Sequence, residues 1–331
     1  MLEKTLAMLA RYQPGEYVPD DVTCYDEVEV EAFGHLLASL VYAPSKLRRR
    51  LQELGASLTR ADFYSEIPSV ADLEASFARP SKLRLDQPFG DAAFLRDFLR
   101  DLTPFGADFE PPATATRGNE FAWDNSQFSY SDAMSYYCMI RRCRPKTIIE
   151  MGCGASTLIA SLACERNGFG RIIAIEPFPG PLLREIPRVE LIVARAQDVD
   201  VGLVDGNLQD GDILFIDTTH TVKHDSDCLH IYLRILPHLT HNIFVHAHDI
   251  RLPYPLPLEM MRDQHIYWTE QYLLYAYLVG NPRTRVLYGS AYHDQANPEL
   301  LAAFMHGRFG QGGASLWFTQ SGSVDMPAGA H

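Results

Sequence analysis

The stretch that most constrains the fold, residues 147–157, reads Thr-Ile-Ile-Glu-Met-Gly-Cys-Gly-Ala-Ser-Thr. Its β-branched start is typical of a buried strand that ends on Glu150, and Gly152 and Gly154 then break the strand. Small and apolar residues follow from Ser156 and indicate the start of a helix. Together these features predict a nucleotide-binding βα unit, because the glycines let a ligand approach the backbone and the helix N-terminus offers unpaired N–H groups.

The spacing of this turn discriminates between nucleotides. A dinucleotide site favours a third glycine three residues after the second, and this chain has Thr157 there. Glu150 would repel a pyrophosphate, whereas its carboxylate can pair with a cationic ammonium group. The turn therefore favours S-adenosylmethionine, which has an adenosyl group and a positively charged amino-acid tail. A second strand-like run, 171–176, ends on Glu176, whose carboxylate can accept both ribose hydroxyls.

Composition and charge limit the partners that such a chain can have. Of its 331 residues, 47% are hydrophobic and 21% are charged, as in ordinary folded proteins. The formal net charge of −13 argues against a nucleic-acid partner, which requires a basic surface. No apolar stretch approaches the ~20 residues needed to span a membrane, no signal peptide is evident, and the six cysteines form no regular framework. We therefore expect a cytoplasmic protein with a small-molecule partner, and a homo-oligomer stays open.

Hydrophobic periodicity predicts two parts and a tail. Residues 1–112 form a helical region that serves as acceptor pocket, lid or oligomerisation element, residues 113–320 form the cofactor-binding domain, and 321–331 form a disordered tail. In the second part strands alternate with helices, which indicates an α/β fold with a parallel sheet covered on both faces. The expected strands are 147–150, 171–176, 189–193, 212–217, 242–246, 285–288 and 315–318. The expected helices are 28–42, 45–58, 70–77, 92–102, 131–143, 156–166, 222–236 and 268–279.

Reactive side chains are expected beyond the carboxyl ends of the strands, where open α/β sheets bind their ligands. Asp217 ends one predicted strand and is followed by His220, and the next strand leads into His246, His248 and Asp249. In one interpretation a histidine removes a proton from a substrate hydroxyl or amine. In another, Asp217 and Asp249 bind a divalent cation, Mg²⁺ or similar, that lowers the pKa of a coordinated hydroxyl. Both interpretations can hold together, and simple hydrogen bonding to loop backbones is the alternative.

One further polar pair follows the third strand. Gln197 and Asp198 lie where a polar side chain can reach the exocyclic amine of an adenine. A turn cap explains these residues equally well. Asp198 is the candidate cofactor ligand of this pair.

The segment from about Phe121 to Trp317 resembles the bacterial class I S-adenosylmethionine-dependent methyltransferases, in the group that includes antibiotic-tailoring and sugar O-methyltransferases. The motifs that carry the resemblance are Ile-Ile-Glu-Met-Gly-Cys-Gly-Ala-Ser-Thr, Ala-Ile-Glu-Pro, Asp-Ile-Leu-Phe-Ile-Asp-Thr-Thr-His, Val-His-Ala-His-Asp-Ile and Trp-Thr-Glu-Gln-Tyr-Leu-Leu. The resemblance implies a Rossmann-like, seven-stranded sheet whose last strand is antiparallel.

The resemblance also implies roles for individual residues. Glu150, Gly152 and Gly154 would hold the methionine portion of the cofactor, and Glu176 would hold the ribose. We expect the cofactor site to include two further positions, Ser156 and Asp217.

Metal-dependent relatives such as the catechol O-methyltransferases place acids at the ends of strands four and five, which correspond here to Asp217 and Asp249. Those relatives follow the second acid with Asn, whereas this chain has Ile250, and His246 or His248 would have to compensate. The acceptor pocket would come from residues 1–130 and 251–265.

The leading interpretation is methyl transfer from S-adenosylmethionine to a hydroxyl, or an amine, of a small polar metabolite. His220, His248 and Asp249 are the expected catalytic residues, with a histidine as general base. An NAD-dependent oxidoreductase is the second interpretation, and it is disfavoured by Glu150 and Thr157. A non-catalytic adenosyl-binding module is the third, because a fold alone does not guarantee chemistry.

Overall fold

The computed structural model describes residues 27–79, 85–116, 118 and 120–323, which divide into two compact units. The smaller unit consists, among the described residues, of 27–79 together with 257–267. Its helices are α2 (Glu27–Val41), α3 (Ser45–Glu53), α4 (Val70–Phe77) and α11 (Leu258–Arg262), and α4 contacts α11. The larger unit takes the remaining described residues, so the boundary expected at residue 112 lies inside it. The tail expected at 321–331 falls mostly outside the described residues.

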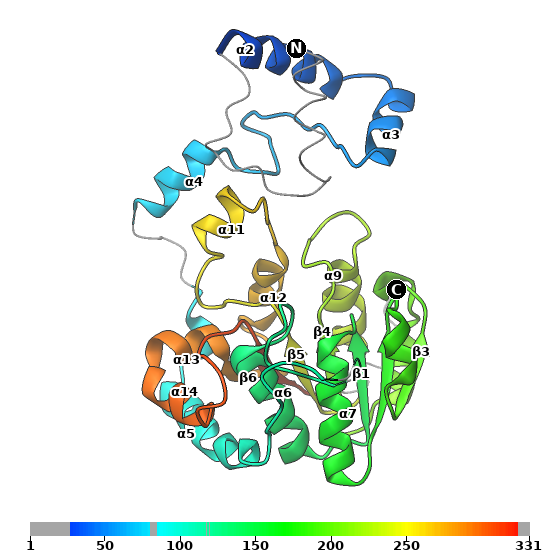
Figure 1. Cartoon of the computed structure of the whole chain (residues 1–331), viewed down its shortest axis with the longest axis vertical. Helices are drawn as coiled ribbons and strands as arrows, with labels where there is room; N and C mark the ends of the chain where they lie inside the picture. The colour runs from blue at the N-terminus through cyan, green and yellow to red at the C-terminus, as the bar shows by residue number, and fades with distance from the viewer. Residues whose placement is uncertain (1–26, 80–84, 117, 119, 324–331) are drawn as a thin grey trace. The chain divides into compact units, whose positions relative to one another are not determined.

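A seven-stranded sheet forms the centre of the larger unit (Figure 1), in the order β3-β2-β1-β4-β5-β7-β6. The first five strands in this order are parallel, and β7 pairs antiparallel with both β5 and β6. The strands are β1 (Thr147–Met151), β2 (Arg171–Ile175), β3 (Val189–Ile192), β4 (Ile213–Ile216), β5 (Ile243–Ala247), β6 (Thr284–Gly289) and β7 (Leu316–Gln320). The predicted seven-stranded sheet with an antiparallel last strand is confirmed.

Helices cover both faces of this sheet. One face packs against α5 (Ala92–Leu102), α6 (Tyr130–Cys143), α7 (Ala155–Asn167) and α14 (Pro298–Phe304). The other packs against α8 (Val201–Asn207), the π-helical turn Ile231–Ile235 between α9 (Asp227–His230) and α10 (Leu236–His238), and α12 (Glu270–Leu278). A further helix, α13 (Ser290–Ala296), follows β6. The remaining short helical turns are Gln87–Phe89, Thr103–Gly106, Pro181–Glu185 and Ala196–Asp198.

The alternation of side chains along the strands explains the two-faced core. Ile148 and Phe215 lie in the core under α6 and α7, whereas Ile149 and Leu214 lie in the core on the opposite face. All four are fully buried. Successive residues of a strand point to opposite faces, so a strand covered on both sides must be apolar throughout. This requirement accounts for the continuous Ile-, Leu- and Val-rich runs that made the strands predictable.

The helix predicted for 222–236 begins later than expected. The hydroxyl of Ser226 accepts a hydrogen bond from the N–H of Leu229, 3.3 Å away, and caps the helix that starts at Asp227. The carboxylate of Asp227 accepts hydrogen bonds from the N–H and the hydroxyl of Thr219 at 2.7 and 2.8 Å. The segment between β4 and α9 is therefore a loop held in place by a buried acid.

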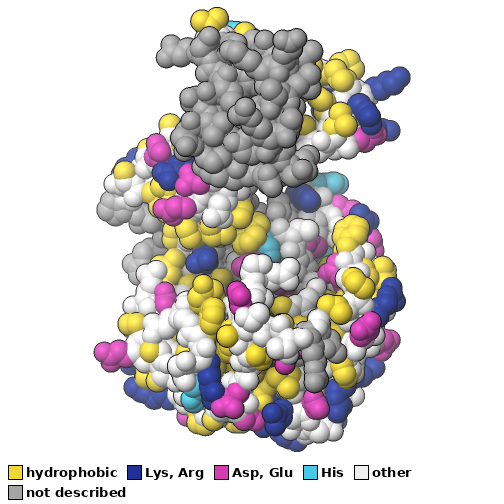
Figure 2. Space-filling view, in the orientation of Figure 1, with side chains coloured by type: hydrophobic (Ala, Val, Ile, Leu, Met, Phe, Trp, Pro, Cys, Tyr) yellow, Lys and Arg dark blue, Asp and Glu magenta, His cyan; other side chains and the backbone are white. Residues whose placement is uncertain are grey.

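The described helices and surface bear on the expected partners. No helix in the described part of the chain has the length and apolar character needed to cross a membrane. On the face shown in Figure 2, the acidic and basic side chains of the larger unit are interspersed and form no continuous basic patch. The absence of a nucleic-acid partner stays a prediction.

Candidate active site

The turn after β1 is fitted against the end of β4. Gly152 has a φ of +85°, and a Cβ placed on it would lie 1.7 Å from the backbone oxygen of Asp217. The N–H of Asp217 in turn donates to the carbonyl of Met151 at 2.8 Å. Position 152 therefore requires glycine for both its backbone angle and its space.

Gly154 is different, because nothing in the protein demands a glycine there. It caps α7 with an extended φ of 175°, and the atom nearest to an added Cβ would be Oε1 of Gln127, at an ordinary 3.6 Å. Its N–H donates to the hydroxyl of Thr157 at 3.2 Å. The missing side chain leaves the start of α7 open to a close-approaching ligand.

Glu150 lies deeper than the sequence led us to expect. Its side chain is fully buried, and its carboxylate accepts hydrogen bonds from the hydroxyls of Tyr136, at 2.8 Å, and Thr157, at 2.5 Å. Burial raises the pKa of Glu150 to about 7, against the opposing effect of these two hydrogen bonds. Ser156 is also buried and contributes a further hydrogen bond to this carboxylate. Glu150 and Ser156 thus form the buried base of the turn. Direct contact of Glu150 with a cofactor stays a prediction.

A pocket of about 280 Å³ lies beyond the carboxyl ends of β1, β2, β3 and β4. Glu176 lines it and is held by the N–H groups of Cys153 and Phe178 at 3.3 and 2.9 Å. Gln197 also lines the pocket, whereas Asp198 forms an exposed, two-pronged ion pair with Arg195 at 2.7 and 3.0 Å. Gln197 thus lines the pocket and Asp198 does not, and contact of either residue with an adenine stays a prediction.

At the mouth of this pocket, two aspartates and two histidines meet. Nε2 of His220 lies 3.2 Å from Oδ1 of Asp217 and 3.5 Å from Oδ2 of Asp249. Nδ1 of His248 lies 3.2 and 3.8 Å from the same two oxygens. His220 and Asp249 both have a positive φ of 56°, a conformation held by their surroundings because it is uncommon outside glycine.

Each histidine of this cluster is backed by a buried carboxylate. Glu270 lies 2.8 Å from Nδ1 of His220 and also accepts a hydrogen bond from the hydroxyl of Tyr232 at 2.6 Å. Asp132 lies 3.4 Å from Nε2 of His248. The ring of His220 also packs beside Trp268, with ring centroids 4.6 Å apart.

These carboxylates set the protonation of the cluster. Burial lowers the pKa of His220, but its hydrogen bonds to Asp217 and Glu270 outweigh this effect and raise the pKa to about 10. For His248, the charge of Asp217 and the hydrogen bond to Asp132 likewise overcome burial and raise the pKa. Burial tends to raise the pKa of Asp217, yet the two imidazoles lower it. The pKa of Asp249 is raised, mainly by burial.

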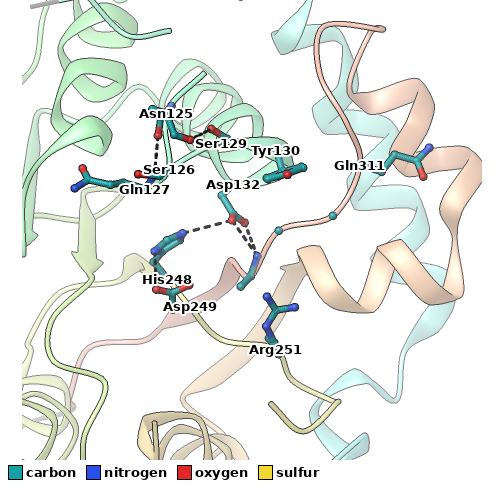
Figure 3. A pocket seen from close by; sticks show the side chains of 13 residues that line it. Asn125, Ser126, Gln127, Ser129, Tyr130, Asp132, His248, Asp249, Arg251 and Gln311 are labelled. Atoms are coloured by element: carbon teal, nitrogen blue, oxygen red, sulfur yellow. Dashed lines mark hydrogen bonds and ion pairs between the residues drawn. The ribbon is translucent and has the colours of Figure 1, made fainter. Parts of the chain in front are cut away.

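A second pocket of about 510 Å³ opens on the other side of the cluster (Figure 3). Its lining is mostly polar and comes from residues 125–132, 248–251 and 311–314. His248 and Asp249 form one wall, with Asp132 above them and Arg251 reaching in from below. Asp217 lines the first pocket and lies 3.2 Å from His248, which lines the second, so the cluster has members in both linings.

Comparison with known proteins identifies the central part of the larger unit. Residues 149–250, which include most of β1, the strands β2 to β5 and the cluster of two aspartates and two histidines, match a family model described as a methyltransferase domain. This part of the chain is similar to methyltransferase domains. The match agrees with the sheet order and with the expected class I fold.

The proteins to which this chain is similar are distant from it in sequence. An uncharacterized protein of Archaeoglobus fulgidus is 29% identical over 162 residues, which cover 45% of this chain and 73% of that protein. The O-methyltransferase from Bacillus cereus, solved with S-adenosylhomocysteine (SAH), is 13% identical, covers 76% of this chain and 97% of its own, and has a TM-score of 0.36. TomG is a Streptomyces achromogenes O-methyltransferase involved in tomaymycin synthesis and was solved with S-adenosylmethionine (SAM). It is 14% identical, the match covers 76% of this chain and 96% of TomG, and the TM-score is 0.36. At such scores the structural likeness adds no weight, and the assignment rests on the family match and the sheet.

The larger unit brings most, but not all, of the predicted residues together around the two pockets. His246 was expected in the same cleft as His248, but it is fully buried within β5, where its Nε2 lies 2.7 Å from the hydroxyl of Ser315 and its ring stacks on Trp317 at 4.2 Å. Burial lowers the pKa of His246, so it is a neutral core residue.

Two residues that back the histidines were missed by sequence reasoning. Asp132 lies in the helix predicted at 131–143 and Glu270 in one of the motifs, but neither was assigned a role. Both are buried acids, 5% and 1% exposed, that come from α6 and α12, outside the strand ends. Each lies in the first turn of its helix, where an acid is common, and a single sequence does not distinguish a buried acid there from an exposed one.

Proposed function

We propose that this protein transfers the methyl group of S-adenosylmethionine to a hydroxyl group of a small polar acceptor. The observation that carries the proposal is the position of the cluster: Asp217 borders the pocket after β1 and β2, while His248 and Asp249 border the polar pocket. Two molecules bound in these pockets would meet at one set of ionisable groups. Such juxtaposition is the main requirement of a transfer reaction.

The donor fits the first pocket. Glu176 offers its carboxylate to the ribose hydroxyls, the Gly152–Gly154 turn and the start of α7 admit the methionine part, and Asp217 faces the cationic end. Supporting this orientation, the two aspartates of the cluster and the two acids behind it, Asp132 and Glu270, are four carboxylates against two imidazoles, so ionised carboxylates outnumber the imidazoles even when both are protonated. A sulfonium and an ammonium group would be stabilised beside it.

The reaction at this site balances as a single displacement. The acceptor oxygen attacks the methyl carbon, the carbon–sulfur bond breaks, and its electron pair stays on sulfur to give S-adenosylhomocysteine. The hydroxyl proton passes to the carboxylate of Asp249, which faces the acceptor pocket beside His248. His220 lines neither pocket. It contacts the two aspartates from behind the linings and orients them.

A divalent cation between Asp217 and Asp249 is a further part of the proposal. Their oxygens and a nitrogen of His248 all lie within 4.8 Å of one another, and these three atoms are suitable metal ligands. When bound, such an ion would lower the pKa of the acceptor hydroxyl.

The test has two parts. Calorimetry should show binding of S-adenosylmethionine and S-adenosylhomocysteine, and the absence of both would refute the proposal; binding of NADH in their place would favour an oxidoreductase. With an acceptor found by transfer of a radiolabelled methyl group, H248Q and D249N should lower kcat about 10²- to 10⁴-fold and leave donor affinity unchanged. Unchanged turnover in both variants would show that the cluster is not catalytic.

A further inference from the structure

Asp132 is a buried acid of α6 that contacts three other parts of the larger unit. Its Oδ1 accepts hydrogen bonds from the N–H groups of Ala314 and Ser315, at 2.9 and 2.8 Å. The hydroxyl of Ser290 donates to the same oxygen at 2.9 Å, and Nε2 of His248 lies 3.4 Å from Oδ2. These partners lie just before β7, just after β6 and just after β5, which are neighbouring strands of the sheet. One buried carboxylate therefore joins the ends of three strands.

The segment before β7 is fitted closely to this carboxylate. Gly313 has a φ of +115°, and a Cβ placed on it would lie 2.5 Å from Oδ1 of Asp132. Only glycine suits both the backbone angle and the lack of space. The N–H of Ser131 also donates to the carbonyl of Gly312, at 3.3 Å. Because residues 311–314 line the polar pocket, Asp132 fixes one wall of that pocket (Figure 3).

The same segment is tied to the residue that follows Asp249. The carbonyl of Ala314 accepts a hydrogen bond from the N–H of Ile250 at 2.7 Å, while the N–H of Ala314 donates to Asp132. Asp249 has a positive φ, which a residue other than glycine keeps only where its surroundings impose it. Asp132 thus contacts His248 directly and reaches the backbone beside Asp249 through two hydrogen bonds.

We propose that Asp132 is a positioning residue for methyl transfer, which holds His248 and Asp249 in a fixed arrangement with the wall of the polar pocket. The proposal rests on the proposed function and adds to it a residue that acts through others. A carboxylate suits this role, because its two oxygens accept several hydrogen bonds at once and its charge strengthens each of them. Placement matters because a shift of about 1 Å can lower the rate of a transfer reaction about 10²-fold.

The variant D132N separates positioning from support of the fold. The amide oxygen of asparagine can still accept from the N–H groups of Ala314 and Ser315, whereas its amide nitrogen cannot accept a hydrogen bond from His248. With the acceptor found by transfer of a radiolabelled methyl group, D132N should therefore lower kcat about 10²-fold and change KM less than about 3-fold. D132A loses both sets of contacts, so it should lower kcat and also raise KM about 10-fold.

Affinity for S-adenosylhomocysteine shows whether a variant has merely lost its structure. Asp132 lines the polar pocket and not the donor pocket, so D132N and D132A should bind S-adenosylhomocysteine as the wild type does in calorimetry. The matched control is D101N. Asp101 is an exposed acid of α5 in the same unit, and its loss should change neither kcat, KM nor donor affinity.

A second variant covers the case in which D132N does not fold. S290A removes one hydrogen bond to Asp132 from outside the pocket lining, and it should lower kcat about 3- to 10-fold with donor affinity unchanged.

Two results would overturn the positioning role. The first is wild-type kcat and KM in folded D132N and S290A proteins. The second is a loss of S-adenosylhomocysteine binding in step with the loss of kcat, which would mark Asp132 as support for the fold alone. Both differ from a failure of the proposed function, in which the wild type itself binds no donor or transfers no methyl group and the positioning role falls with it.

Discussion

The backbone oxygen of Asp217 occupies the space that a side chain at Gly152 would need, since an added Cβ would lie 1.7 Å from it. The turn that follows β1 and the residue that ends β4 are thus packed backbone to backbone. This contact fixes the donor pocket, which both residues line, against the ionisable cluster, to which Asp217 also belongs.

Replacement of Gly152 by alanine should therefore disrupt the fold. The positive φ and the backbone collision both penalise a side chain, and we expect G152A to lower the free energy of unfolding by more than about 3 kcal/mol. The control is G206A in α8, where an added Cβ meets nothing within 4 Å and should be neutral or stabilise by about 0.5–1 kcal/mol. Urea unfolding measures both changes, and equal stability of the two variants would contradict the packing argument.

Replacement of Gly154 by alanine should weaken donor binding and leave the stability of the fold unchanged. Its added Cβ would make only an ordinary contact with Gln127, so G154A should retain the wild-type unfolding midpoint. The same methyl group would fill the open start of α7 and should weaken binding of S-adenosylmethionine at least about 10-fold, as measured by calorimetry. Wild-type donor affinity in a folded G154A protein would show that the ligand does not approach this turn.

Glu150 should couple stability to pH. Its pKa is raised by burial, from 4.5 to about 7, so the folded state binds its proton more tightly than the unfolded state does. The contribution of Glu150 is therefore fully present below pH 4.5 and is lost as the pH rises through 7, by about 3 kcal/mol in total. Thermal melting between pH 5 and 8 should show a decline that is smaller in E150Q.

The same titration should govern donor binding. A cationic donor is attracted to ionised Glu150, so wild-type affinity for S-adenosylmethionine should increase as the pH rises through 7, and E150Q should abolish this dependence. Calorimetry at pH 6 and pH 8 compares the two proteins. An identical pH dependence in both would assign the effect to another group.

Arg251 should select the acceptor. It lines the polar pocket, its N–H is held by the side chain of Gln271 at 3.2 Å, and no carboxylate among the described residues lies within ion-pair distance of its guanidinium. An unpaired guanidinium there favours an acceptor with a carboxylate or phosphate group. R251Q should raise KM for such an acceptor about 10-fold and leave donor affinity unchanged, whereas the surface variant R166Q should change neither. An acceptor without negative charge, bound equally well by R251Q, would contradict this prediction.

The sequence by itself determined the sheet and the donor turn. A parallel sheet covered on both faces requires apolar side chains at every position, so its strands appear as continuous Ile- and Val-rich runs, and all seven were located to within two residues. The turn after β1 could also be predicted from the sequence, because Gly152 meets a local backbone requirement.

Only the tertiary structure decided which polar residues do what. His246 and His248 are two residues apart in sequence, yet one is a neutral core residue inside β5 and the other lies beyond the strand end between Asp132 and Asp217. The carboxylates behind the histidines come from α6 and α12, far away in the chain. Local sequence patterns record the periodicity of a strand, but the charge that holds a buried imidazole depends on long-range packing, and that is set only when the helices close over the sheet.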